Sequence, residues 1–577
     1  MFLNLSIIIK KLISSLINNI KNILMEKFII LLMLCLFIVP SLSLEYTITL
    51  PVNPEQTQFL KNKLLDISNP NSENWRNFMT LEEIRNISRP STELRKEVFN
   101  WLGNFDVECL DFGDSLRCNS TSEVAALMWD LNISPKSKAL SGEVTIPDNL
   151  KDNILFVEGL YQKKKIRNIP NSNVKAFNNI QPDAGLVGLE TMERLYNFSN
   201  VNADSSVAAI EYQGSSGFSQ SDLNMNNGLN MLRKNNVSHV VGNDQFSDLE
   251  TQLDLQMEAL VAQNADLWFW DDDGWLLSFA TNFFNTKDVP NVISMSWGWA
   301  EDKQCDITSC GNRTSQEYVD RVNLEYVKIG LRGVSILVSS GDAGAPGRTS
   351  EDCDMDRPVN PVMPGSSPWI TSVSATFVNS SNSKVNWKST FCKENNCPSG
   401  KVEYPTGYNW TGWTTGGGFS IYDKTEKWQE EAVNKYLSDN VPLPNKFNNK
   451  GRGYPDISMI GHNCPVVNDG QVEGVDGTSC SSPVAAGVIA VLNSLEKDKG
   501  KKPLGFLNPL LYLMHQEDSS IFNDVTVGNN FCTEYNCCPG SKDKGSDFGF
   551  LSSKGWDPVT GLGTLNVGKM IEYLDNH

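Results

Sequence analysis

Gly477-Thr-Ser-Cys-Ser-Ser-Pro483 runs directly into Val484-Ala-Ala-Gly-Val-Ile-Ala-Val-Leu492, and this junction decides the fold. The second part is apolar all round and predicts a buried helix. Pro483 fits its first turn, where no backbone N–H is needed. Ser479 then lies near the helix N-terminus, where free N–H groups and the dipole favour negative charge on oxygen. A serine that only caps a core helix is the alternative, and the full stretch favours a nucleophile.

A pair of carboxylates lies upstream, in residues 248–261. Glu250 and Asp254 are four residues apart, so a helix places both on the same side, beside an apolar stripe of Leu249, Leu253, Met257 and Leu260. Two neighbouring carboxylates repel when both are charged, so one pKa rises and the pair shares a proton at low pH. Glu250 is therefore a candidate base, with Asp254 as its partner. Two solvated charges on an exposed helix face are the alternative.

The serine stretch resembles that of the subtilisin superfamily, whose members use a histidine base oriented by an aspartate. None of the four histidines is followed by glycine, as the usual His-Gly-Thr turn requires: His239, His462, His515 and the terminal His577. A carboxylate base is therefore the preferred interpretation. A neutral, histidine-dependent peptidase remains a rival, with His239, His462 or His515 at its site.

Several further strings resemble the sedolisins, the serine-carboxyl peptidases, over nearly the whole chain. They are Glu250-Thr-Gln-Leu-Asp254, Ser340-Gly-Asp-Ala-Gly344, Gly416-Gly-Gly-Phe-Ser420, Arg452-Gly-Tyr-Pro-Asp-Ile-Ser458, Pro503-Leu-Gly-Phe-Leu-Asn-Pro-Leu-Leu-Tyr512 and Gly555-Trp-Asp-Pro-Val-Thr-Gly561. The resemblance is strongest to the lysosomal members that release tripeptides. It implies an acid serine peptidase made as a zymogen, which removes tripeptides from unblocked N-termini through an acyl-enzyme. An acid endopeptidase of the same family and a non-catalytic secreted glycoprotein on this fold are the alternatives.

The resemblance implies a role for each matching residue. Ser479 is the nucleophile, Glu250 the base and Asp254 its orienting partner, while Asp342 faces the oxyanion. A carboxylate cannot donate a hydrogen bond, so Asp342 has to be protonated there, which predicts an acid optimum. A turn-capping aspartate is the alternative for Asp342. Backbone edges that pair with the substrate are expected at Ser296, Trp297, Gly298, Gly416, Gly417 and Gly418.

The resemblance also implies one Ca²⁺ ion near the C-terminus. Two carboxylates and backbone carbonyls from glycine-rich loops suit such a hard cation. The matching positions are Asp524, Val525, Ser553, Gly555 and Asp557. Ser553 departs from the family pattern, which has glycine there, and its carbonyl serves only if the backbone angles allow.

An α/β fold is predicted from about residue 185 onward, where short apolar runs alternate with longer helical patterns. The predicted strands cover residues 206–211, 291–296 and 334–340. Ser296 and Asp342 fall at their carboxyl ends, where such sheets form their sites. If the chain follows the family, these strands belong to a subtilisin-like sheet of seven parallel strands flanked by helices.

Three regions are predicted along the chain. Residues 1–43 are a leader and signal peptide, 44–180 an α+β activation propeptide, and 181–577 the peptidase. Helices are predicted over 54–67 and 91–101, and a basic linker follows at 163–173, the kind of exposed segment where proteolysis concentrates. The propeptide is expected to fold over the site as an inhibitor and to be removed in acid.

Several features favour the secretory pathway, and the family resemblance favours the lysosome. Lys27, an apolar run over 28–39, Pro40 and small residues at 41–43 have the layout of a signal peptide, whether Met1 or Met25 is the start. The run is too short for a comfortable membrane span, so no permanent anchor is expected; an uncleaved anchor is the alternative. Twelve of 13 cysteines lie outside this run, an even number that suits disulfides, and Cys109 with Cys118 is a candidate pair.

The charge of the chain and its glycosylation motifs limit the classes of partner that we expect. The net charge is −19 and there is no long basic run, so no nucleic-acid footprint is visible. Carboxylates in excess fit either an ordinary soluble surface or an acidic compartment in which they titrate. Peptides and proteins are the expected substrates. Asn-x-Ser/Thr glycosylation motifs occur at Asn86, Asn119, Asn132, Asn197, Asn236, Asn312, Asn379 and Asn409.

Overall fold

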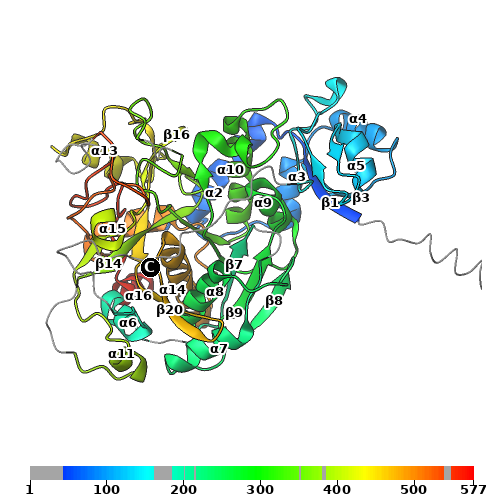
Figure 1. Cartoon of the computed structure of the whole chain (residues 1–577). Coiled ribbons are helices and arrows are strands. Elements are labelled where there is room, and N and C mark those ends of the chain that lie inside the picture. The colour runs from blue at the N-terminus through cyan, green and yellow to red at the C-terminus, as the bar shows by residue number, and fades with distance from the viewer. Residues whose placement is uncertain are drawn as a thin grey trace, which may run out of the picture.

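The computed structural model describes residues 43–161, 185–199, 202–212, 216–349, 353–379, 385–538 and 547–577. The predicted signal peptide and basic linker lie outside the described residues. An N-terminal unit, drawn in blue and cyan, sits beside the main body next to α9 and α10 (Figure 1).

The N-terminal unit is an antiparallel sheet of order β2-β3-β1-β6 with helices packed on it. Its helices begin at good caps: Asn53 and Thr80 each accept a hydrogen bond from a backbone N–H of the first turn. The elements are β1 (Ser43–Thr49), α2 (Pro54–Ser68), α3 (Leu81–Ser88), α4 (Thr92–Leu102), β2 (Glu108–Asp111), β3 (Ser115–Thr121), α5 (Ser122–Trp129), β4 (Asn132–Ile133), β5 (Leu140–Ser141), η1 (Asp148–Leu150) and β6 (Phe156–Glu158).

The main body is built on a sheet of ten strands with the order β21-β22-β18-β14-β12-β10-β7-β9-β8, in which β15 also pairs with β14. The seven strands from β8 to β18 are mutually parallel and form the sheet expected from the family. Three short strands, β15, β21 and β22, extend it. The strands are β7 (Ser206–Glu211), β8 (Val237–Val241), β9 (Asp266–Asp271), β10 (Val292–Met295), β12 (Ser335–Ser339), β14 (Thr371–Val378), β15 (Glu403–Pro405), β18 (Ile457–Ile460), β21 (Phe522–Asn523) and β22 (Thr564–Leu565).

Helices cover both faces of this sheet, so its central strands are buried on both sides. Val292 of β10 packs in the same cluster as α8 and α14, whereas its neighbour Ile293 packs with α9 and α10. The helices are α6 (Leu189–Tyr196), α7 (Gln220–Leu229), α8 (Leu249–Val261), α9 (Leu276–Asn285), η2 (Glu301–Asp306), α10 (Ser315–Leu331), α11 (Thr390–Glu394), α12 (Tyr408–Thr411), α13 (Glu430–Ser438), α14 (Thr478–Asp498), α15 (Asn508–Glu517), η3 (Ser519–Ile521) and α16 (Val567–Asn576). Three small two-stranded antiparallel sheets complete the body: β11 (Trp299–Ala300) with β13 (Val362–Met363), β16 (Gly418–Lys424) with β17 (Gly451–Tyr454), and β19 (Cys464–Asn468) with β20 (Gln471–Val475).

The N-terminal unit docks through α2 onto the α9 and α10 face. Leu60 and Leu64 of α2 belong to the same buried cluster as Phe279 and Tyr318 of the main body. Charged contacts reinforce the junction, including an ion pair of 2.7 Å between Arg76 and Glu496. The two units therefore share a continuous apolar core.

Helix α14 begins earlier than the sequence predicted. It starts at Thr478, so Pro483 lies inside the helix rather than in its first turn, and the prediction for Pro483 was wrong. Tertiary packing carries the helix through the small residues that precede the proline. By length and composition α14 is apolar enough to cross a membrane, but 94% of its apolar window is buried inside the molecule, as in a core helix.

Candidate active site

Helix α8 carries both predicted carboxylates. Asp248 caps it by accepting a hydrogen bond from the Thr251 N–H. Glu250 is 6% exposed and Asp254 is fully buried, so the alternative of two solvated charges is wrong. The reason is that α8 packs along α14, beneath the surface of the main body (Figure 1).

Ser479 is the second residue of α14, as the position of a nucleophile near a helix N-terminus requires. The preceding Gly477 has φ +149°, and its N–H donates to the Gly461 carbonyl over 2.9 Å. Ser481 donates to the Ile460 carbonyl over 3.0 Å, which ties the helix to the carboxyl end of β18. A disulfide between Cys464 and Cys480 fixes the same turn.

Ser296 connects the two helices at the end of β10. Its Oγ donates to Oδ1 of Asp254 over 2.9 Å and lies 3.5 Å from the carbonyl oxygen of Ser479. The Ser479 carbonyl cannot accept the usual helical hydrogen bond from the residue four positions later, because that residue is Pro483, which has no N–H. The side chain of Ser479 is hydrogen-bonded to Glu250.

Burial dominates the electrostatics of the carboxylate pair. It raises the pKa of Glu250; repulsion from Asp342 adds to the rise, and the hydrogen bond from Ser479 opposes it. Burial also raises the pKa of Asp254 well above its usual range, and the charge of Glu250 adds to this rise. The two groups therefore hold at least one proton together in acid.

Asp342 follows β12 and faces the start of α14. Its Oδ1 accepts hydrogen bonds from the N–H and Oγ1 of Thr478, each over 2.8 Å. Burial raises the pKa of Asp342, and the positive charge of Arg348 opposes the rise. A protonated carboxyl is therefore favoured at this position more than at an ordinary aspartate.

A cavity opens beside these groups. The residues that line it include Ser296, Trp297, Gly298, Asp342, Arg348 and Thr478. The predicted substrate edge at 296–298 thus forms one wall of the cavity.

The second predicted substrate edge, residues 416–418, is buried. A Cβ on Gly416 would lie 2.4 Å from the Ser340 carbonyl, and one on Gly417 would lie 2.2 Å from the Pro558 carbonyl. Close backbone packing thus requires glycine at these two positions, and a contact with substrate stays a prediction.

The histidines have other partners. His462 pairs with Asp476 over 2.9 Å, and His239 stacks on Trp268. His515 contacts the ring of Phe522. Among the described contacts of these histidines, none reaches Ser479, which weakens the histidine-dependent rival.

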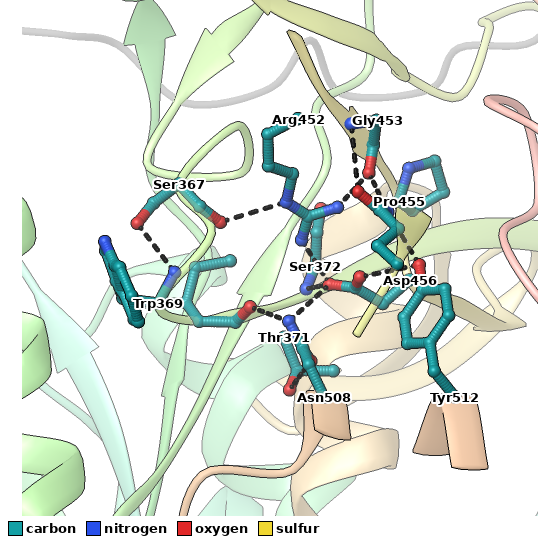
Figure 2. Close-up of polar contacts among 12 residues, drawn as sticks. Ser367, Trp369, Thr371, Ser372, Arg452, Gly453, Pro455, Asp456, Asn508 and Tyr512 are labelled. Carbon is teal, nitrogen blue, oxygen red and sulfur yellow. Dashed lines mark hydrogen bonds and ion pairs between the residues drawn. The ribbon is translucent and has the colours of Figure 1, made fainter. Parts of the chain in front are cut away.

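A buried ion pair lies at the start of β18, the strand to which Ser481 of α14 is bonded. Arg452 of β17 pairs with Asp456, which also accepts hydrogen bonds from the Ser372 N–H over 2.8 Å and the Tyr512 hydroxyl over 3.0 Å. Figure 2 shows the guanidinium directed at Asp456, with Asn508 and Tyr512 reaching the same carboxylate from α15. The Arg452–Ser458 string of the sequence thus joins β14, β17, β18 and α15.

The predicted calcium ligands come together near the C-terminus. The Gly555 N–H donates to Asp524 over 2.9 Å, the Ser553 N–H donates to Asp557 over 3.0 Å, and Thr560 bonds to both Asp557 and the Val525 carbonyl. Ser553 is not among the described non-glycine residues with positive φ, so a serine fits there without backbone strain. Two carboxylates with nearby carbonyls are a donor set that suits Ca²⁺.

The cysteines and glycosylation motifs fit the secretory interpretation. Cys109–Cys118 is a disulfide, as expected, and all twelve cysteines outside the leader are paired; the other bridges are Cys305–Cys310, Cys353–Cys538, Cys392–Cys397, Cys464–Cys480 and Cys532–Cys537. All eight candidate asparagines are exposed. Disulfides fit an oxidising compartment.

Sequence reasoning missed three residues at the site, namely Thr478, Arg348 and Glu534. Thr478 could have been found from the sequence, because it is next to the predicted nucleophile and its hydroxyl can donate a hydrogen bond to a facing carboxylate. Arg348 and Glu534 are 186 residues apart and meet only through loops. No local pattern indicates such a pair.

Comparison with known proteins identifies the class. Residues 38–162 match the pro-kumamolisin activation domain, and residues 273–505 match the subtilase family. The fold resembles that of Pseudomonas sedolisin, a serine-carboxyl proteinase solved with pseudo-iodotyrostatin, with a TM-score of 0.50 and 21% identity over 68% of this chain and 99% of that chain. Fold and activation domain together define a subtilisin-like serine peptidase made as a zymogen.

Full-length relatives define the family. The chain is 35% identical to Physarolisin of Physarum polycephalum, covering 92% of this chain and 93% of the relative. It is 29% identical to Tripeptidyl-peptidase 1 of Homo sapiens, covering 92% of each chain, and 25% identical to that of Dictyostelium discoideum, covering 92% and 89%. The chain belongs to the sedolisin family of serine-carboxyl peptidases.

Proposed function

We propose that this peptidase works in acid with Ser479 as nucleophile, Glu250 as general base, Asp254 as the partner of Glu250, and Asp342 as oxyanion donor. One observation carries the proposal: two buried carboxylates of α8 meet the second residue of α14, linked through Ser296. Burying two carboxylates side by side costs stability, and such costly pairs cluster at functional sites, which supports a catalytic role for this one.

The proposed reaction follows from these positions. The Ser479 oxygen forms a bond to the substrate carbonyl carbon while Glu250 takes its proton. Protonated Asp342 donates a hydrogen bond to the oxyanion of the tetrahedral intermediate. The intermediate collapses as the C–N bond breaks, and Glu250 returns the proton to the leaving amine. Water then attacks the acyl-enzyme in the same way and restores the Ser479 hydroxyl.

We propose that the released fragment is a tripeptide from an unblocked N-terminus, in line with the similarity to Tripeptidyl-peptidase 1. The test is mass spectrometry of products from one decapeptide, offered with a free and with an acetylated N-terminus to acid-activated protein. Successive tripeptides from the free peptide and none from the acetylated one are expected. Internal cleavage of both peptides would replace this mode with that of an acid endopeptidase.

We also propose one structural Ca²⁺ held by Asp524, Asp557 and the carbonyls of Val525, Ser553 and Gly555. The ion would join loops that meet at the end of the sheet. Calcium at about 100 times its Kd should add about 2.7 kcal/mol to the free energy of unfolding. Differential scanning calorimetry of the full chain should show a lower Tm in chelator than in calcium, and Asp524→Asn should remove this difference. An equal response in wild type and variant would refute the site.

The proposed setting is the secretory pathway, ending in the lysosome, with N-linked glycans on the eight exposed motifs. The paired cysteines and the exposure of every candidate asparagine support this setting. The activation domain is proposed to inhibit the enzyme until acid releases it. Endoglycosidase treatment of protein from a eukaryotic host should lower its apparent mass, and an unchanged mass would contradict the glycans.

A further inference from the structure

A charge pair of a half-buried arginine and a buried glutamate lies beside Asp342. Arg348 donates from Nε to Oε1 of Glu534 over 3.1 Å and from Nη2 to Oε2 over 3.2 Å, a two-point contact that fixes the plane of the guanidinium. The same Nη2 lies 3.6 Å from Oδ2 of Asp342. The Glu534 side chain is only 2% exposed, and Arg348 also lines the cavity.

Two disulfides hold this pair in place. Cys532–Cys537 closes the loop that carries Glu534, and Cys353–Cys538 ties that loop to the segment following Arg348. Exposed ion pairs lose much of their effect to side-chain freedom and solvent screening. Glu534 is buried, and the two-point contact and the disulfides restrict Arg348, so solvent screening and side-chain freedom are reduced in this pair.

The charges around Asp342 act in opposite directions. Arg348 favours the ionised form of Asp342, while Glu534 and, from α8, Glu250 favour the protonated form. Tyr535 adjoins Arg348, and Thr478 occupies Oδ1 with two donated hydrogen bonds. Oδ2 is therefore the oxygen that faces Arg348, and its protonation responds to the balance within the pair.

We propose that Arg348 and Glu534 are a positioning pair that sets the upper pH limit of catalysis, by placing one positive and one negative charge beside Asp342. The inference rests on the proposed role of Asp342 as a protonated oxyanion donor. Arg348 acts through Asp342 and confines the enzyme to acid, and Glu534 limits the strength of that effect.

Neutralising each partner should move the alkaline limb of kcat/KM in opposite directions. Arg348→Gln removes the cation and leaves Glu534 unopposed, so Asp342 stays protonated to higher pH and the limb moves up by about 1 unit. Arg348 also lowers the pKa of Glu250, so the acid limb should move the same way. Glu534→Gln leaves Arg348 unopposed, and the alkaline limb should move down by about 1 unit.

Three further variants separate charge from packing. Arg348→Lys keeps the positive charge but loses the two-point contact with Glu534. Its alkaline limb should therefore stay closer to that of the wild type than the limb of Arg348→Gln does. The double variant Arg348→Gln/Glu534→Gln loses both charges and should return towards the wild-type limb. Arg357→Gln is the matched arginine control, because the ion-pair partner of Arg357 is Asp302.

The experiment is a pH–rate series from pH 3 to 8 on acid-activated full-chain protein, with Ser479→Ala as background. Opposite shifts of the two glutamine variants support the inference. Unmoved limbs, or shifts of the same sign, overturn it while leaving the proposed function intact. If Arg348→Gln does not fold, Glu534→Gln alone tests the inference. An alkaline limb of Glu534→Gln that stays in place or moves up would then overturn it. Absence of Ser479-dependent hydrolysis in wild type would instead overturn the proposed function, and this inference with it.

Discussion

In the proposed mechanism, the acid optimum depends on Asp342. Its buried carboxyl can donate to an oxyanion only below its own pKa, which burial raises. Activity should therefore be present on the acid side of that pKa and be lost as the pH rises through it.

Two substitutions test this role. Asp342→Ala should lower kcat by about 10²–10³-fold with little change in KM, because an oxyanion donor acts mainly in the transition state. Asp342→Asn donates at every pH, so the alkaline limb of its residual activity should move upward. Steady-state kinetics from pH 3 to 8 measure both effects, with the exposed Asp518→Ala as control. A wild-type kcat in Asp342→Ala would contradict the role.

At this scale the sequence could predict residues that sit in motifs. Ser479, Glu250 and Asp254 are candidates from a helix N-terminus and i,i+4 spacing, the sedolisin resemblance implies their roles, and the structure brings them together. Burial of the carboxylate pair could not be predicted from α8 alone, because the apolar residues of α14 that cover it lie more than 200 positions away. The Arg348–Glu534 pair depends on two loops whose course only the folded chain defines.

Among the elements, the connection between β17 and β18 depends on the Arg452–Asp456 ion pair. Both side chains are fully buried, and the carboxylate is shared with the hydroxyl of Tyr512 (Figure 2). Arg452→Met would leave Asp456 buried and unpaired, at a cost of about 3–5 kcal/mol in the free energy of unfolding.

The chain offers a matched control for this prediction. Lys435 and Asp439 have the same i,i+4 spacing, but their side chains are 59% and 42% exposed. Lys435→Met should cost at most about 0.5 kcal/mol. Chemical denaturation of both variants gives the comparison, and equal losses would mean that burial does not determine the strength of the pair.

Periodicity predicted the elements of the sheet better than the start of α14. The apolar run at 206–211 coincides with β7, and the runs at 291–296 and 334–340 contain β10 and β12. Helix α14 begins at Thr478, nearly two turns before its apolar stretch, next to Gly477 and the Cys464–Cys480 disulfide. Local propensity says little about a boundary that tertiary contacts determine.

In the whole molecule, two buried carboxylates of the activation domain respond to pH in opposite ways. Burial acts to raise the pKa of Asp114, but Lys328 and Arg321 outweigh it and lower that pKa; Lys328 lies 2.7 Å away. This contact stabilises docking fully at pH values above the ordinary aspartate pKa of about 3.9. The stabilisation is lost as the pH falls through the lower pKa that Asp114 has in the docked domain. Burial raises the pKa of Glu158 to about 7, so its contribution is present in acid and lost as the pH rises through about 7.

Asp114 is therefore the contact whose loss favours release of the domain. Asp114→Asn leaves two buried cations with Glu325 alone and should speed conversion of the zymogen at pH 4–5 by roughly tenfold or more. Glu158→Gln keeps the neutral form at all pH values and should slow any release between pH 5 and 7. Gel densitometry against time measures both, and unchanged half-times would show that neither carboxylate controls docking.

The most direct test of the account is the rate of hydrolysis of a free-N-terminal Ala-Ala-Phe reporter from pH 3 to 8, for acid-activated wild type beside Ser479→Ala. With Ser479 as nucleophile and a carboxylate as base, we expect activity confined to acid in the wild type and none above background in the variant. Activity that rises through pH 7, or that survives in Ser479→Ala, would contradict a serine nucleophile served by a carboxylate base.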